Sequence, residues 1–259
     1  MKKKIFTFIS ALIIMLSFAA CDGQAAEILK RINSSSDNKT ETAESKTERV
    51  DDEFDSEGRT PKLITIKGEM YSTYLTELDL SEMGLSNTDI EPLKYMVHLK
   101  ELYLWDNRIS DLSPLSELVN LTVLDLDYNK ITDITPLSGL VNLEELYLSE
   151  NRIEDITPLS GLTALSELYL WDNRIVDITP LSELNDLVDL DLYGNRINDL
   201  TPLHGLSGLM WLDVCDNPFS DEQKEALEEA LPFCTIYFDY DYDDYDNYHN
   251  YNDNYSYPL

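Results

Sequence analysis

At 259 residues the chain can hold one or two domains, and its formal net charge is −31, from 50 acidic against 19 basic residues. This charge argues against nucleic-acid binding, because affinity for phosphates comes from Lys and Arg. It favours cationic partners instead. Three cysteines are too few for a disulfide framework.

Residues 1–21 join a basic start, an apolar run and a cysteine. Three lysines precede the run, and Cys21 follows it directly. This order fits an export signal better than a membrane span, which needs about 20 apolar residues. Residues 17–21 resemble a lipobox, with Phe18 where that motif usually has leucine. We predict a lipoprotein-type signal, lipidation of Cys21 and a membrane anchor; the alternative is ordinary cleavage near Ala25, which would release an exported soluble protein.

Residues 22–60 are rich in Ser, Thr, Asp, Glu and Lys and poor in large apolar side chains. Such a stretch cannot bury enough apolar surface to offset the entropy cost of ordering it. We therefore predict a disordered polar tether between the anchor and the folded part of the chain.

The next segment, residues 61–74, contains a short β-like run at 63–66 followed by Gly68. The end of a repetitive structure must be shielded from water. We predict that 61–74 forms an N-terminal cap strand.

Residues 75–217 repeat with a period of 22. Five copies begin at Leu99, Leu121, Leu143, Leu165 and Leu187, with a weaker copy before them and a truncated copy after. Two consecutive copies read LEELYLSENRIEDITPLSGLTA and LSELYLWDNRIVDITPLSELND. A fixed period of this size predicts a solenoid. The shared pattern LxxLxLxxNxIxDIxPLxxLxx resembles the bacterial 22-residue leucine-rich repeat of internalin-type surface proteins.

The resemblance implies an α/β solenoid: a right-handed leucine-rich-repeat arc with a parallel concave β-sheet and short 3₁₀ or α turns on the convex side. The residues agree with it. The alternation LxxLxLxxN is a strand signal, and the repeated Asn needs buried hydrogen-bond partners at the turn that follows. The later Ser-Pro or Thr-Pro pair is a helix start, in which we expect the hydroxyl to cap. The first copy has Met83 in place of Asn, so the Asn ladder should begin one copy late.

After the repeats we predict a C-terminal cap over 218–238. It consists of a helix that begins after Ser220, with Gln223 at the capping-box position, and a closing strand that starts near Phe233. Residues 239–259 are mostly Tyr, Asp and Asn, which predicts a disordered tail.

The outward strand positions form three rows along the predicted concave face. The third-position row is Glu77, Glu101, Val123, Glu145, Glu167, Asp189 and Trp211. The fifth-position row is Asp79, Tyr103, Asp125, Tyr147, Tyr169, Asp191 and Asp213. The seventh-position row is Ser81, Trp105, Asp127, Ser149, Trp171, Tyr193 and Cys215. All three tryptophans of the chain fall in these rows, beside many acids.

Large exposed aromatic rings among acids are typical of a contact surface. The alternative is that repeats simply duplicate their strand residues. We predict that the ligand-binding residues are Tyr103, Trp105, Asp125, Asp127, Tyr147, Tyr169, Trp171, Asp191, Tyr193 and Trp211.

Two kinds of partner fit this surface. A basic protein would find carboxylates and cation–π faces, whereas a polysaccharide would find rings to stack on. The resemblance to internalins implies protein–protein recognition, with adhesion as one form of it. A carbohydrate-binding surface protein and a passive envelope component stay open as alternatives.

No catalytic, cofactor or metal signature is recognisable. The three histidines are isolated, and neither a nucleophile elbow nor a phosphate loop occurs. We therefore predict an exported, non-enzymatic binding protein without a cofactor or a metal.

Overall fold

The computed structural model describes residues 61–239. The predicted signal with its lipidated Cys21, the predicted tether over 22–60 and the predicted tail beyond Asp239 lie outside the described residues, and those three predictions remain untested. Among the described residues, no helix is long and apolar enough to cross a bilayer.

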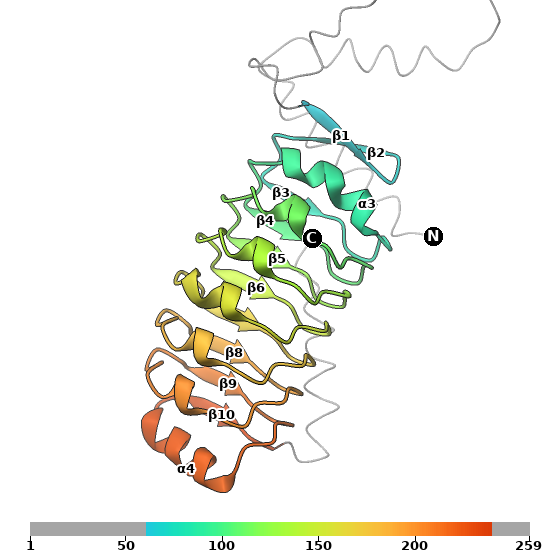
Figure 1. The fold of residues 1–259 in the computed structure, drawn as a ribbon. Coiled ribbons are helices and arrows are strands. Elements are labelled where there is room, and N and C mark those ends of the chain that lie inside the picture. Colours follow the sequence, from blue (N-terminus) through green and yellow to red (C-terminus); the bar gives the residue numbers. More distant parts are fainter. Residues whose placement is uncertain (1–60, 240–259) are drawn as a thin grey trace, which may run out of the picture. The chain divides into compact units, whose positions relative to one another are not determined.

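The described residues form a solenoid arc built on one parallel sheet, as predicted (Figure 1). The order of the strands in this sheet follows the order of the chain, so every strand pairs with the strand of the next repeat. The strands are β3 (Glu77–Asp79), β4 (Glu101–Tyr103), β5 (Val123–Asp125), β6 (Glu145–Tyr147), β7 (Glu167–Tyr169), β8 (Asp189–Asp191), β9 (Trp211–Asp213) and β10 (Thr235–Tyr237).

The opposite side of the solenoid carries short helical turns, which face the viewer in Figure 1. The first repeat, two residues longer than the others, has α3 (Asn87–Ile90) and η2 (Glu91–Tyr95). The later repeats have one 3₁₀ turn each: η3 (Ser113–Leu115), η4 (Thr135–Leu137), η5 (Thr157–Gly161), η6 (Thr179–Leu181) and η7 (Thr201–Leu203).

The expected hydroxyl caps of these 3₁₀ turns are wrong. The Ser or Thr is the first residue of each turn, and no side chain of the preceding residue caps it. Instead the Asp two residues earlier accepts the Ser or Thr backbone N–H, as Asp155 Oδ1 does from Thr157 N at 2.8 Å. A carboxylate accepts this bond more strongly than a hydroxyl because the bond is charge-assisted.

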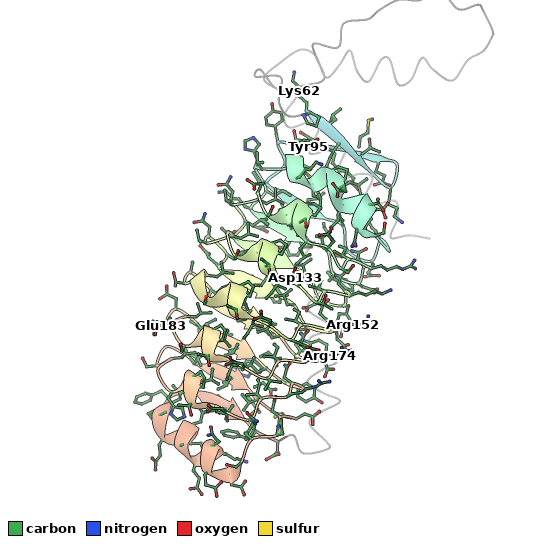
Figure 2. The ribbon with its side chains drawn as sticks, in the orientation of Figure 1. Lys62, Tyr95, Asp133, Arg152, Arg174 and Glu183 are labelled. Atoms are coloured by element: carbon green, nitrogen blue, oxygen red, sulfur yellow. The ribbon has the colours of Figure 1, made fainter. Side chains whose placement is uncertain are left out.

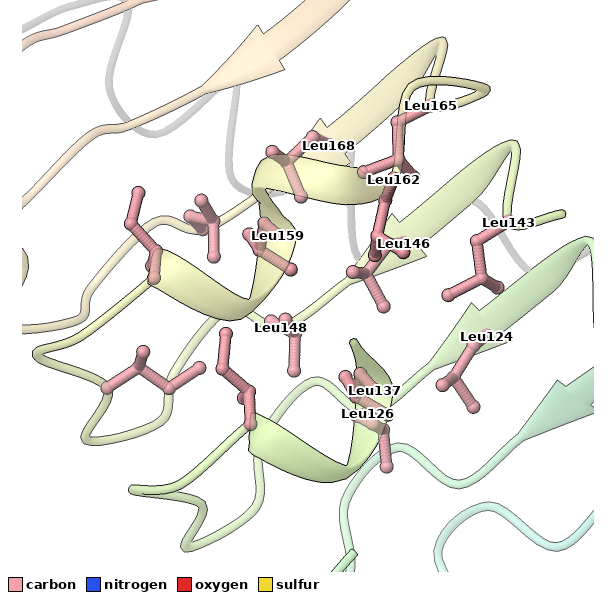
Figure 3. Packing of buried hydrophobic residues seen from close by; sticks show 14 of the residues in the cluster. Leu124, Leu126, Leu137, Leu143, Leu146, Leu148, Leu159, Leu162, Leu165 and Leu168 are labelled. Atoms are coloured by element: carbon pink, nitrogen blue, oxygen red, sulfur yellow. The ribbon is translucent and has the colours of Figure 1, made fainter. Parts of the chain in front are cut away.

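The leucines and isoleucines of the repeats stack into one continuous core between the sheet and the 3₁₀ turns (Figure 3). Leu124, Leu146 and Leu168 come from adjacent strands, and each has no exposed surface. Every layer is therefore closed by the layers on either side of it, and a single repeat has no core of its own.

The predicted Asn ladder is confirmed. Asn151 Nδ2 donates to the carbonyls of Leu126, Leu148 and Ser149 at 3.0–3.1 Å, and its Oδ1 accepts the N–H of Ile131 at 2.9 Å. The ladder begins at Asn107, whose Oδ1 accepts the N–H of Leu85 in the first repeat. Each Asn thus ties its own strand exit to the preceding repeat.

The N-terminal cap is a hairpin rather than the single strand expected for 61–74. Antiparallel strands β1 (Leu63–Ile66) and β2 (Glu69–Ser72) form their own two-stranded sheet. Lys67 and Gly68, both with positive φ, make the turn between them. Ile64 and Ile66 face the core and close its first layer.

The C-terminal cap has the predicted helix and strand. Helix α4 (Asp221–Ala230) follows Ser220, and β10 adds to the sheet beside β9. Gln223 does not complete a capping box: its Oε1 accepts the N–H of Leu200 at 2.8 Å and so ties α4 to the last repeat. Cys215 and Cys234 are both free thiols.

Candidate functional site on the concave face

Strand register brings the predicted residues into straight rows. Glu145 pairs with Glu167, Tyr147 with Tyr169 and Asp191 with Asp213. Neighbouring parallel strands lie about 4.8 Å apart. Each row therefore places one side chain of every repeat beside its counterparts on the concave face.

A network of tyrosines and glutamates occupies the middle of this face. The Tyr147 and Tyr169 rings stack with centroids 5.1 Å apart and planes 19° apart. Tyr147 Oη lies 3.2 Å from carboxylate oxygens of both Glu145 and Glu167. Burial and the charge of Glu145 raise the pKa of Glu167. These rings are held in place by their neighbours, which lowers the entropy cost of using them in binding.

Three aspartates of the fifth-position row are far less exposed than a contact surface suggests, whereas Asp79 at the N-terminal end is exposed. Exposed fractions are 8% for Asp125, 2% for Asp191 and 1% for Asp213. Each carboxylate accepts the backbone N–H two residues later, as Asp191 Oδ1 does from Tyr193 N at 3.0 Å. These aspartates therefore stabilise the turn that follows each of their strands.

Burial raises the pKa of these carboxyls. It raises the pKa of Asp125 and of Asp213 to about 6. For Asp191 burial comes first and the neighbouring Asp213 adds to it, so that its pKa lies well above the ordinary range. Ionisation therefore costs more free energy at these carboxyls than at an exposed aspartate.

A second cluster surrounds Ser149 in the seventh-position row. Trp171 and Tyr128 meet edge to face, with ring centroids 5.5 Å apart, although a whole repeat separates them. Ser149 holds the seventh position of the repeat that separates them, and it is fully buried. Its small side chain leaves room for the indole to lean back toward Tyr128, and this contact leaves Trp171 only 7% exposed.

The remaining predicted residues lie along the same face. Tyr103, Trp105 and Tyr193 are half-buried, and Tyr103 Oη donates to Glu101 at 3.0 Å. Trp211 sits at the C-terminal end, where its ring lies 5.9 Å from that of Tyr237 on β10.

The comparisons with known proteins agree with this geometry. The family described as Leucine Rich repeats (2 copies) matches residues 97–139, 119–161, 141–183 and 163–204. An internalin of Listeria monocytogenes is 32% identical with a TM-score of 0.59, and the match covers 66% of this chain and 52% of that one. Residues 97–204 are thus similar to leucine-rich repeats, and the fold is similar to that of an internalin.

Two further solved structures share this fold. A leucine-rich-repeat protein of Leptospira interrogans is 28% identical, with a TM-score of 0.54 over 57% of this chain and 39% of that one. The ectodomain of the Arabidopsis thaliana receptor kinase GASSHO1/SCHENGEN3, solved in complex with Casparian strip integrity factor 2, is 26% identical, with a TM-score of 0.53 over 64% and 21%. The chain spans about half or less of the length of these three proteins. No curated protein matches it.

Tyr128 is not among the residues predicted from the sequence. The residue stands at the eighth position, in the turn after each strand, where φ is positive. The other copies have Asp, Glu or Gly there, as in Asp106, Glu150 and Gly194. An aromatic ring at a turn position otherwise filled by acids and glycine was the available signal.

The leucine-rich-repeat face is acidic without matching cations. Ion pairs between residues 61 and 239 join Lys67 to Asp89, Lys94 to Glu91, Arg174 to Glu154 and Lys224 to Asp239. None of these pairs includes Asp125, Asp127 or Asp191. Arg152 and Arg174 project from one edge of the solenoid (Figure 2). In the described part of the chain, no three His, Cys, Asp or Glu side chains are grouped as a metal site requires.

Proposed function

We propose that the protein is an exported, non-enzymatic surface protein that recognises a protein partner through its concave leucine-rich-repeat face. The observation that carries this proposal is the alignment of rigid aromatic rings and carboxylates on one sheet face. Rings held by their neighbours and surrounded by polar groups are typical of the anchors of protein interfaces.

The charge of the face supports a basic partner. Buried or half-buried carboxylates without a described counter-charge repel one another, and a cationic partner relieves that repulsion. The internalin and the receptor ectodomain share the fold, and the receptor ectodomain was solved in complex with Casparian strip integrity factor 2. Adhesion is one form that such recognition can take.

The ring geometry is less suited to the polysaccharide alternative. Sugars stack on the flat side of an aromatic ring, whereas Tyr147 and Tyr169 stack their flat sides on each other. The Tyr147 hydroxyl also bonds Glu145 and Glu167. A glycan array that is positive with wild-type protein and negative with Trp105→Ala would favour the polysaccharide.

The Trp105→Ala variant tests the protein-binding proposal. Immobilised full-length protein is used to capture partners from an extract over a salt series. We expect Trp105→Ala to weaken capture at least tenfold, because buried aromatic anchors commonly contribute more than about 2 kcal/mol. Capture by wild-type protein should also fall steeply with salt, because screening weakens attraction between opposite charges.

Phe233→Ala is the matched control. Phe233 is an aromatic residue of the C-terminal cap that is 93% exposed and lies outside the three rows. We expect this variant to capture partners as the wild type does. Equal capture by Trp105→Ala and wild type would contradict the proposal.

A further inference from the structure

One edge of the solenoid carries a row of basic side chains that lies outside the proposed binding face. The row takes one residue from the tenth position of each of the five similar repeats: Arg108, Lys130, Arg152, Arg174 and Arg196. All five residues are exposed, and Arg152 and Arg174 mark the edge from which the row projects (Figure 2). At about 4.8 Å per strand, this basic row is about 19 Å long.

The basic row concentrates positive charge in a strongly acidic chain. Of the ten Lys and Arg residues between 61 and 239, five form the row. The other five are Lys62, Lys67, Lys94, Lys100 and Lys224. Neighbouring like charges in such a row repel one another, so an extended anion that contacts several of them stabilises the row.

The acids beside the row compensate this charge only weakly. The aspartates three residues after it bond their own 3₁₀ turns, as Asp155 Oδ1 does with the backbone N–H of Thr157 at 2.8 Å. The ion pair of the row described above joins Arg174 to Glu154 at 3.9 Å, and both side chains are exposed. An exposed pair of this kind contributes little, because water and salt screen it.

The C-terminal segment, residues 240–259, has the complementary charge. It contains no Lys or Arg, and its five aspartates are Asp241, Asp243, Asp244, Asp246 and Asp253. Four of them stand within 241–246, and six extended residues span about 20 Å, close to the length of the row. The acidic concave face repels this segment, whereas the basic row attracts it.

The chain also leaves the fold at the edge that carries the row. Strand β10 runs parallel to β9, with Tyr237 opposite Asp213, so its C-terminal end lies at the edge where the other strands end. Each repeat turns into its tenth position at that same edge. Asp239 is held there by an ion pair with Lys224 at 3.0 Å. Arg196, in the repeat of β8, is two strand spacings or about 10 Å from β10, within reach of three extended residues.

We propose that residues 240–259 turn back along this edge and bind the basic row through the aspartates at 241–246. Twenty residues span up to about 66 Å, whereas Arg108 at the far end of the row is six strand spacings, about 29 Å, from β10. Because the segment and the row belong to one chain, the effective concentration is high and individually weak ion pairs suffice. The inference goes beyond the proposed function and does not depend on it.

The test is cross-linking of the full chain with a carbodiimide, which joins a carboxylate directly to a lysine amine. Arg174→Lys keeps the charge and adds a reactive amine to the row, near Lys130. We expect mass spectrometry to find links from Lys130 and from position 174 to the aspartates at 241–246. Lys100 is the matched control, because it is an exposed lysine at the opposite edge, directly before β4. Equal linkage of Lys130 and Lys100 to this segment would overturn the proposal.

Two double variants test whether the charge of the row holds the segment. Arg152→Gln with Arg196→Gln removes two charges from the row and keeps Lys130 and every aspartate of the segment. We expect the yield of the Lys130 link to fall at least fivefold, and to fall likewise for the wild type in 1 M salt, where the screening length is about 3 Å. Lys62→Gln with Lys94→Gln removes two charges outside the row and should leave the yield unchanged. Equal yields from the two double variants would contradict the proposal.

A mixture of unlabelled and ¹⁵N-labelled full chains distinguishes the segment of the same chain from that of a second copy. We expect the linked peptides to carry the same isotope on both sides. Links that combine the two isotopes at the frequency of random pairing would assign the row to a second copy and overturn the proposal. The absence of any link between the segment and the row would also overturn it, while leaving the binding test of the concave face unaffected.

Discussion

Replacing Asn151 by alanine is expected to lower the free energy of unfolding by about 3 kcal/mol. The amide makes four hydrogen bonds to main-chain groups at 2.9–3.1 Å, and its side chain is buried. Alanine removes the acceptor of the Ile131 N–H and one of the two donors at each of the three carbonyls, which keep their bonds from Asn129, Asn173 and Tyr128. The melting temperature should fall by roughly 6–12 °C for a folded unit of this size.

Asn120→Ala is the control for this substitution. Asn120 is exposed, and its Nδ2 donates to the Val97 carbonyl at 2.7 Å. The expected loss is about 1 kcal/mol or less, because water replaces the exposed bond. Equal losses from the two variants, measured by urea unfolding, would mean that the ladder contributes no more than an ordinary surface bond.

Asp191→Asn is expected to stabilise the protein at pH 7.5 by roughly 1–3 kcal/mol. The carboxyl is 2% exposed, and burial with the neighbouring Asp213 raises its pKa well above the ordinary range. The stability that a group with a raised pKa contributes is fully present below its unfolded pKa, about 3.9, and is lost as the pH rises through its folded pKa. Asparagine keeps the acceptor for Tyr193 N–H without acquiring a charge.

The two proteins should therefore differ little at pH 4 and clearly at pH 7.5 when unfolding is followed in urea. Asp177→Asn is the control, because hydrogen bonds from Thr179 lower the pKa of the exposed Asp177 carboxyl. Its contribution has the opposite sign: it is present above the unfolded pKa and is lost as the pH falls. A gain from Asp191→Asn that is the same at both pH values would contradict the linkage argument.

Much of the fold was predictable because it is local and periodic. The alternation at 101–104 predicts β4, and the same residues predict the strand of every later copy. Asn107 and its counterparts predict the ladder, since a buried amide at a strand exit has only the adjacent main chain to bond. The late start of the ladder follows from Met83 alone.

The sequence predicted which residues of the candidate site line up in rows on the concave face, but no more than that. The alternation of side chains along a strand places Trp105 and Asp191 on the same face of the sheet. It does not predict how deeply each side chain is buried. Asp191 became inaccessible because its carboxylate bonds a backbone N–H and larger neighbours surround it. Tyr128 and Trp171 meet because the intervening Ser149 is small, and this depends on three repeats at once.

The sequence by itself determined the repeat, its inward leucines, its Asn ladder and the face that gathers the tryptophans, because these depend on a period of 22 residues and on alternation within a strand. Only the tertiary structure decided that 61–74 forms a hairpin, that Asp rather than Ser or Thr caps the 3₁₀ turns, and that Trp171 lies against Tyr128. The physical reason is that burial and hydrogen-bond satisfaction are set by neighbours in adjacent repeats, which stacking brings within a few ångströms.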